Sequence, residues 1–234
     1  MPGIWNHVIT ETPVAVIDFE TTGMFAGPDR VVEAAIVRID PGCAPQVAFD
    51  SLIHPQRRMA ATFVHGITDN DVADAPTFDQ IADQFAEALA GCVVAAYNVY
   101  FDAKFLHHEL SRVGICQLLP HLCLMYLRPL LDLGRVTKLA DACRRHRVSL
   151  NGAHTAAGDA LAAAELWRCY GSQFANLGLK TFADLANRRS YKFTHSFRHD
   201  PLPSRGNSNR ANVKSRYNSI ADRGTLWEAL SHSM

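Results

Sequence analysis

The sequence has no long apolar segment. None of its apolar runs approaches the roughly 20 residues that a membrane-spanning helix needs. Residues 1–11 also lack the basic start and apolar block of a secretory signal. We therefore expect a protein without membrane contact that works in the cytoplasm.

The chain also lacks any C-x-x-C pair, although it contains six cysteines. Their scattered positions indicate neither a cysteine-based zinc site nor a disulfide framework. The sequence has no internal repeat. We expect reduced and mostly buried thiols.

Net charge is absent as well, because 23 basic residues balance 23 acidic ones, but the two signs are unevenly distributed. Residues 1–187 contain 14 Lys and Arg against 20 Asp and Glu, whereas residues 188–234 contain 9 against 3. An acidic body suits a site that gathers metal ions, and a basic tail suits a polyanion or an acidic partner. The 234 residues therefore predict one domain at 1–187 and a flexible basic tail at 188–234.

Two carboxylates follow an apolar run at residues 14–17, which is rich in β-branched side chains and typical of a buried strand. Asp18 and Glu20 are two residues apart, so they lie on the same face of that strand. Placing two like charges side by side is costly unless a cation sits between them. Oxygen ligands suit Mg²⁺ or Mn²⁺. The alternative is an edge strand with a solvated acidic end.

The remaining pattern predicts strands first, and then strands alternating with helices. Strands at residues 30–40 and 46–53 follow the first through tight turns, which indicates an antiparallel meander. An almost wholly apolar run at residues 92–97 is typical of a strand buried on both faces. The other expected elements are a loop at 64–69, helices at 77–90, 101–113 and 118–133, a helix at 137–147 capped by Thr137, a helix at 155–170, and a short helix opened by Thr181 and Asp184. The fold class is therefore α/β, with a mixed sheet flanked by helices.

Two further acids occur where a shared metal site needs them. Asp102 stands near the start of a helix just beyond the apolar run at 92–97. Asp159 lies inside an alanine-rich helix, and His154 lies on the loop before it. A carboxylate among alanines on a buried helix needs a partner, and a metal ion supplies one.

Three motifs in this order resemble the 3′-5′ exonucleases of the DEDD superfamily, histidine branch, which includes epsilon proofreading subunits of bacterial DNA polymerase III. The D-F-E-T-T-G motif is residues 18–23, the N-x-x-F-D motif is residues 98–102, and the H-x-x-x-x-D motif is residues 154–159. The run His65-Gly66-Ile67 also fits. The resemblance covers about residues 12–186 and leaves the tail outside.

The resemblance implies an RNase H-like fold and a two-metal site. The acids Asp18, Glu20, Asp102 and Asp159 would hold two divalent ions, Mg²⁺ or Mn²⁺. His154 would take the proton from the attacking water, a task that suits imidazole because its ordinary pKa lies near neutral pH.

The resemblance also implies substrate contacts close to these acids. Thr21, Thr22 and Met24 would line the terminal nucleotide, with backbone N–H groups near the threonines reaching its 3′ hydroxyl. His65 and Phe101 would cradle the base and sugar, and Asn98 would brace the site. Flat or apolar side chains grip any base, so little sequence preference is expected. The alternatives are core packing for Met24 and Phe101 and a local hydrogen bond for His65.

The tail has two interpretations. Basic and aromatic residues alternate at 188–198, a mix that suits single-stranded nucleic acid. In epsilon subunits a flexible tail joins the nuclease to the polymerase, so Trp227 and Leu230 would be anchors for a polymerase subunit. The alternative is a solvated, disordered end without a partner.

The sequence therefore predicts a metal-dependent 3′-5′ exonuclease that releases nucleoside 5′-monophosphates from single-stranded or frayed DNA ends, in proofreading or repair. An RNA 3′-trimming exoribonuclease of the same superfamily is an alternative, because these motifs serve both polymers. A catalytically silent module that binds nucleic acid or a polymerase is a further alternative.

Overall fold

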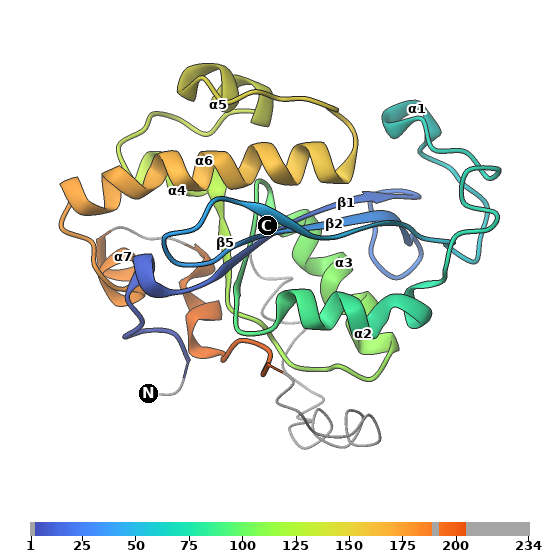
Figure 1. Cartoon of the computed structure of the whole chain (residues 1–234), viewed down its shortest axis with the longest axis horizontal. Helices are drawn as coiled ribbons and strands as arrows, with labels where there is room; N and C mark the ends of the chain where they lie inside the picture. Colours follow the sequence, from blue (N-terminus) through green and yellow to red (C-terminus); the bar gives the residue numbers. More distant parts are fainter. Residues whose placement is uncertain (1–2, 189–191, 205–234) are drawn as a thin grey trace.

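A five-stranded sheet forms the centre of the protein, as a computed structural model of residues 3–188 and 192–204 shows (Figure 1). The strands are β1 (Val14–Thr21), β2 (Val31–Ile39), β3 (Gln46–Leu52), β4 (Val93–Ala96) and β5 (His121–Cys123). Their spatial order is β3-β2-β1-β4-β5. The first three form an antiparallel meander, whereas β4 runs parallel to β1 and β5 parallel to β4. The predicted mixed sheet is confirmed.

Helices cover both faces of this sheet (Figure 1). The α-helices are α1 (Thr62–His65), α2 (Phe78–Leu89), α3 (Val99–Arg112), α4 (Leu124–Leu130), α5 (Leu139–His146), α6 (Ala156–Asn176) and α7 (Phe182–Arg188), and the 3₁₀ helices are η1 (Ile9–Glu11) and η2 (Lys192–Arg198). Helix α6 lies along the face of β1 and β2, and α2 lies on the opposite side (Figure 1). Across the described ranges, no helix combines the length and the apolar character needed to span a bilayer.

Alternation along β1 decides which side chains meet each helical layer. Phe19 is buried and stacks on Phe85 of α2, with ring centroids 6.1 Å apart. Because neighbouring residues of a strand point to opposite faces, Asp18 and Glu20 project from the other face, where α6 packs. The sheet therefore presents its acids to the helix that carries Asp159.

The pairing of β1 with β2 changes register at the end of β1. Glu20 pairs with Glu33, but the next residue, Thr21, pairs with Val31, so Val32 is the extra residue of a β-bulge. A bulge increases the local twist and changes the direction of nearby side chains. This bulge lies next to Glu20 and Glu33.

Several predicted elements need correction. The region 118–133, expected to be helical throughout, contains strand β5 before α4, and Pro129 lies inside that helix. Residues 64 and 65 belong to the short helix α1 rather than to a loop. Helix α5 has Lys138, not Thr137, as its N-cap, and α6 extends to Asn176. Helix α3 begins at Val99, so Asp102 lies in its first turn.

The segment 192–204 packs against the domain, although the sequence predicts a flexible tail from residue 188. Phe193 and Phe197 are buried, so the interpretation that these two rings stack on nucleic acid is wrong. The Ser196 hydroxyl accepts a hydrogen bond from the His121 backbone on the edge strand β5 (3.0 Å), and the Leu202 carbonyl accepts one from Gly91 (2.7 Å). The remaining tail, with Trp227 and Leu230, lies outside the described residues.

Candidate active site

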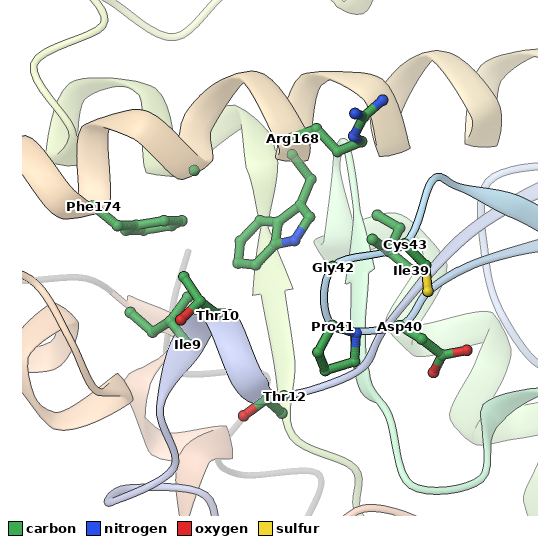
Figure 2. A pocket seen from close by; sticks show the side chains of 12 residues that line it. Ile9, Thr10, Thr12, Ile39, Asp40, Pro41, Gly42, Cys43, Arg168 and Phe174 are labelled. Atoms are coloured by element: carbon green, nitrogen blue, oxygen red, sulfur yellow. The ribbon is translucent and has the colours of Figure 1, made fainter.

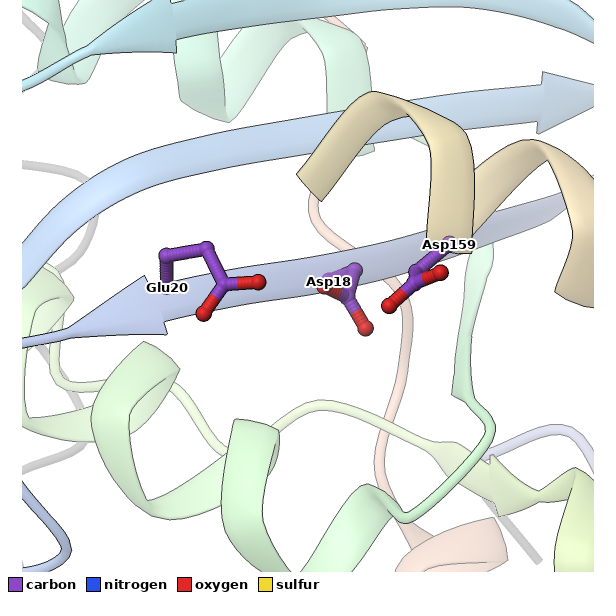
Figure 3. Close-up of side chains that lie close together, drawn as sticks. All are labelled: Asp18, Glu20 and Asp159. Carbon is purple, nitrogen blue, oxygen red and sulfur yellow. The ribbon is translucent and has the colours of Figure 1, made fainter. Parts of the chain in front are cut away.

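Three carboxylates from two elements converge on the sheet face that α6 covers (Figure 3). Asp18, Glu20 and Asp159 each offer one oxygen, and these oxygens all lie within 4.8 Å of one another. Figure 3 shows Asp18 and Glu20 on β1 and Asp159 on the helix beside it. Acids separated by about 140 residues therefore share one site.

The capped N-terminus of α6 positions Asp159. The Thr155 side chain accepts a hydrogen bond from the backbone of Gly158 (3.2 Å), as Ser and Thr caps commonly do. Asp159 follows in the first turn of α6. The cap therefore fixes the orientation of the turn that points Asp159 at β1.

Burial and mutual repulsion raise the pKa of these acids. Burial raises the pKa of Asp18 well above its usual range, and the charges of Asp102, Asp159 and Glu20 add to this effect. Burial and the charge of Glu33 raise the pKa of Glu20 to about 7. Burial also raises the pKa of Asp159, although a hydrogen bond from the His154 backbone opposes it. The fold thus holds several carboxylates where the protein alone does not stabilise their charge.

These residues fit a divalent metal ion. Oδ1 of Asp159 is buried and has no hydrogen-bond partner within the described part of the chain. A buried acceptor without a partner is costly, and a cation would remove that cost. The three acids offer only oxygen donors, which are the ligands of hard ions such as Mg²⁺ and Mn²⁺.

Asp102 lies next to this group but outside it. It is buried in the first turn of α3, and burial raises its pKa to about 8, whereas hydrogen bonds from the backbone of Phe19 and of Asp102 itself lower it. Its charge acts on Asp18 more strongly than that of any other acid. The structure therefore brings Asp102 to the site but not within the short mutual distances of the other three.

His154 is exposed on the turn before α6. Its backbone has a positive φ of 68°, which is uncommon for a residue with a side chain. Its charge lowers the pKa of Asp159, so the imidazole is close enough to interact with the acids.

The side chains at the end of β1 and in the turn that follows it differ in their exposure to solvent. Met24 is 71% exposed, which excludes the core-packing alternative for its side chain. Thr21 and Thr22 are buried, and their hydroxyls bond to Gly23 and to Asp29 within the same turn. The N–H of Thr22 donates to the Arg30 carbonyl (2.9 Å), so it is not free for a 3′ hydroxyl.

Both ring nitrogens of His65 contact backbone atoms of the protein. Its Nδ1 accepts from the Ile67 backbone (3.1 Å), and its Nε2 lies 3.3 Å from the Thr21 carbonyl oxygen. Burial lowers its pKa, which favours the neutral ring. One of its two bonds is therefore local, and the other attaches α1 to the end of β1.

Asn98 and Phe101 lie at the amino end of α3. Asn98 is exposed and is the N-cap of this helix, without a side-chain hydrogen bond to it. Phe101 is half-buried and packs on Phe105, with ring centroids 4.9 Å apart. One part of Phe101 belongs to the core and another part is accessible.

Glu33 is a further acid beside the site and was not among the predicted site residues. This residue lies opposite Glu20, and its Oε2 accepts a hydrogen bond from the Ala156 N–H at the start of α6 (3.1 Å). An acid within the otherwise apolar run of residues 31–37 was the available signal. Its place beside the site depends on the strand register, which the sequence does not display.

A separate cavity of about 300 Å³ lies between the amino end of β1 and the C-terminal half of α6 (Figure 2). Its lining includes Ile39, Pro41 and Arg168. Ile39 pairs with Val14, six residues before Glu20 on the same strand, which corresponds to roughly 20 Å. The cavity is therefore separate from the acidic cluster.

Solved structures with a similar fold include exonucleases. E. coli Exonuclease I in complex with a dT13 oligonucleotide aligns with a TM-score of 0.60 and 16% identity, over 71% of this chain and 42% of that chain. Exonuclease X in complex with 5′ overhanging duplex DNA aligns with a TM-score of 0.55 and 21% identity, over 75% of this chain and 99% of that one. The architecture is that of the RNase H-like exonucleases.

The family follows from the sequence comparison. The exonuclease family model RNase_T matches residues 15–167, and the chain belongs to this family. The predicted relation to the DEDD exonucleases is confirmed.

The similar curated proteins include polymerase subunits. A DNA polymerase III subunit epsilon-like protein of Rhodobacter capsulatus is 35% identical over 191 residues, which is 76% of this chain and 27% of the relative. DNA polymerase III subunit epsilon of Treponema pallidum is 33% identical over 111 residues, which is 46% of this chain and 51% of the relative. The chain thus spans about a quarter to a half of the length of these relatives.

Proposed function

We propose that the protein is a metal-dependent 3′-5′ exonuclease that releases nucleoside 5′-monophosphates from DNA 3′ ends. The observation that carries the proposal is the convergence of Asp18, Glu20 and Asp159, whose oxygens lie within 4.8 Å of one another. The polymerase III epsilon names of the relatives support the 3′-5′ direction and the DNA substrate.

The acids would bind the metal ions. Asp18, Glu20 and Asp159 would hold Mg²⁺ or Mn²⁺, and Asp102 would complete the ligand set for a second ion. When bound, the two ions supply charge neutralisation at the phosphate and activation of the attacking water. The raised pKa values of Asp18 and Glu20 support this role, because a cation at the site would favour their ionised forms.

His154 would act as the general base. Its imidazole is exposed and close enough to affect Asp159, so a ring nitrogen can accept a proton from water on the solvent side of the cluster. Asp159 would orient the histidine through the hydrogen bond from the His154 backbone. A base on this turn would return the proton to solvent.

The neighbouring residues would hold the terminal nucleotide. Met24 has the exposed apolar side chain that contact with a base needs. Phe101 and the ring face of His65 would enclose the sugar and base, and the exposed Asn98 would brace the strand. Thr21 would contribute through its backbone, and Thr22 would shape the turn through its bonds to Asp29 and Arg30.

The test uses a single-stranded DNA oligonucleotide labelled at its 5′ end and incubated with Mg²⁺ or Mn²⁺. A 3′-5′ exonuclease produces a ladder of shortened labelled products and nucleoside 5′-monophosphates, and a chelator stops the reaction. Asp18→Asn is expected to reduce the rate by roughly 100-fold or more, because several kcal/mol of charge stabilisation depend on the bound ions. The matched control is Asp74→Asn, which changes an exposed acid outside the site.

The results that would overturn the proposal are equally specific. Absence of shortening with either ion would indicate a silent binding module. Release of the 5′ label as a mononucleotide would reverse the direction. Faster trimming of an RNA oligonucleotide than of matched DNA would identify an exoribonuclease, since the motifs serve both polymers.

The relatives also suggest a polymerase subunit as partner. The basic residues after 204 would form that contact. Mixing the full chain, and a chain that ends at 204, with the purified polymerase subunit of the same organism tests this proposal by gel filtration. Co-elution of only the full chain would support it, and co-elution of neither would overturn it.

A further inference from the structure

Glu33 connects the sheet to the helix that carries Asp159. Its Oε2 accepts a hydrogen bond of 3.1 Å from the N–H of Ala156, the first residue of α6. The two residues are 123 positions apart in the sequence. This contact joins the start of α6 to β2.

The turn that carries His154 is hydrogen-bonded to Thr155, which directly precedes Ala156. Thr155 donates from its hydroxyl to the Gly152 carbonyl (2.7 Å), and its backbone N–H donates to the same oxygen (3.0 Å). His154 lies inside this ring of bonds with its backbone in the left-handed region. The position of the imidazole thus depends on the position of Ala156 and Thr155.

Close packing leaves the turn little room to adjust. A Cβ atom added to Gly158 would lie 2.3 Å from the Gly152 carbonyl oxygen and 2.5 Å from that of Asn151. The turn therefore rests directly on the first turn of α6. A movement of the helix start would carry His154 with it.

Holding Glu33 here has an electrostatic cost. It faces Glu20 across the strand pair, and its charge also acts on Asp18. An acid held against other acids needs a reason, and two are available: it either binds a metal ion or fixes the helix start. The bond from the Ala156 N–H to its Oε2 is formed, and this bond favours the second role.

We propose that Glu33 is a positioning residue, which fixes the start of α6 on β2 and thereby sets the place of His154 at the metal site. The role of His154 in this proposal rests on the proposed function. The contact between Glu33 and Ala156 does not, because it is formed between atoms of the chain itself. A negative charge at the amino end of α6 also interacts favourably with the helix dipole.

Two variants separate positioning from metal binding and from charge alone. Glu33→Gln keeps a carbonyl oxygen that can accept from Ala156 but removes the charge. Glu33→Ala removes both. An exposed acid outside the site, changed in Glu11→Ala, provides the control.

The first readout is hydrogen–deuterium exchange of residues 151–160 in the presence of a chelator. We expect Glu33→Ala to accelerate exchange in this segment by 10-fold or more, and Glu33→Gln and Glu11→Ala to leave it within about 2-fold of the parent chain, since only the alanine variant lacks the acceptor. This measurement does not require catalysis. Melting temperatures show whether each variant is folded.

The second readout is steady-state kinetics on the DNA oligonucleotide. We expect kcat to fall by roughly 100-fold in Glu33→Ala with a small change in KM, because a displaced base costs about that much. Glu33→Gln should keep kcat within about 3-fold. Mn²⁺ binding, followed by calorimetry, should weaken more in Glu33→Ala than in Glu33→Gln, because the displaced start of α6 also carries Asp159.

Each contrary result identifies a different error. If both variants lose kcat and Mn²⁺ affinity equally, Glu33 is a ligand and the positioning role is overturned. If exchange at 151–160 is unchanged in Glu33→Ala, the contact does not hold the turn and the proposal also fails. If the exchange difference is found but the parent chain does not shorten DNA, the contact stands and the proposed function fails.

Discussion

Glu20 and Glu33 lie directly opposite each other on the antiparallel strands β1 and β2. Like charges in this position destabilise a strand pair. Asp18 and Asp159 add further negative charge beside them, and the pKa of each of these four acids is raised. The fold therefore maintains an arrangement that costs stability in the absence of a cation.

This arrangement predicts how the stability of the metal-free protein depends on pH. A carboxyl group with a raised pKa in the folded state binds more protons folded than unfolded, so the free energy of unfolding decreases as pH rises between the two pKa values. The pKa is about 7 for Glu20 and about 8 for Asp102. The free energy of unfolding should therefore decrease from about pH 4 to about pH 8. Burial lowers the pKa of His121 to about 4, which gives the opposite slope, but only up to about pH 6.5.

The measurement is a series of melting temperatures between pH 6.5 and 8.5. With a chelator present, we expect the melting temperature to fall across this range, and Asp102→Asn to make the fall smaller. Excess Mg²⁺ or Mn²⁺ should raise the melting temperature most at the high-pH end, because an ion that binds only the folded state stabilises it. A melting temperature that stays constant or rises with pH in the chelator would contradict the assignment.

A buried ion pair predicts a large loss of stability when one of its partners is removed. Arg30 precedes β2 and bonds through Nε and Nη2 to both oxygens of Glu109 on α3, at 2.7 and 3.0 Å. Both residues are buried, and Arg30 also donates to the Pro55 carbonyl. Glu109→Ala should lower the free energy of unfolding by about 3–5 kcal/mol, because it leaves a buried charge without its partner.

The control for this pair is the double variant Arg30→Met with Glu109→Leu. It removes both charges and keeps most of the volume, so it should cost less than the single change. Denaturant titrations of the three proteins give the comparison. A single variant that loses less than about 1 kcal/mol would show that water or another group replaces Glu109.

The meander and the motif acids could be predicted because their signals are local. Alternation and apolar runs predict β1, β2 and β4 nearly to their ends. The two-residue period of a strand places Asp18 and Glu20 on the same face. Strand β5 was missed because it joins α4 in one apolar run. Periodicity does not separate a short buried strand from a buried helix.

Glu33 and the aromatic segment at 192–198 show where the sequence stops being informative. Counted from the turn, Thr21 pairs with Val31, so regular pairing would place Val32 opposite Glu20. The bulge shifts the register by one residue and places Glu33 there instead. Phe193 and Phe197 have the same composition signal whether they bind nucleic acid or pack on the domain. Only the three-dimensional contacts show that both are buried.

The buried aromatic segment predicts a dependence of the fold on residues after 188. Phe197 has no exposed surface and contacts Phe182 and Trp5, with ring centroids 5.3 and 6.1 Å apart. Phe197→Ala should lower the free energy of unfolding by about 3–5 kcal/mol, the usual range for a buried phenylalanine. Phe63→Ala is the control, since Phe63 is 88% exposed and should change stability by less than about 0.5 kcal/mol.

Truncation gives an independent check of the same segment. A chain that ends at 188 should unfold at a clearly lower denaturant midpoint than a chain that ends at 204, because it lacks three buried apolar side chains. Equal midpoints for the two chains would show that Phe193, Phe197 and Leu202 do not stabilise the domain.

Two glycines of α6 provide the last prediction, because the same substitution should have opposite effects at them. At Gly158 a new Cβ would meet the carbonyl oxygens of Asn151 and Gly152 at 2.5 and 2.3 Å, so backbone must move. At Gly171 nothing lies within 4 Å of that position. Gly158→Ala should therefore lower the free energy of unfolding by about 1–3 kcal/mol, as overpacking does. Gly171→Ala should raise it by about 0.5–1 kcal/mol, because alanine favours the helix interior.

The two glycine variants also distinguish an effect on stability from an effect on the position of His154. The displaced turn in Gly158→Ala should reduce kcat on the DNA oligonucleotide by roughly 10-fold or more, since small misplacements of a reacting group are costly. Gly171 lies 13 residues further along α6, between three and four turns away, so Gly171→Ala should keep the parent kcat. Equal activity of both variants would mean that the contact between Gly158 and the carbonyls of residues 151 and 152 does not control the base, and that the turn finds its place only when substrate binds.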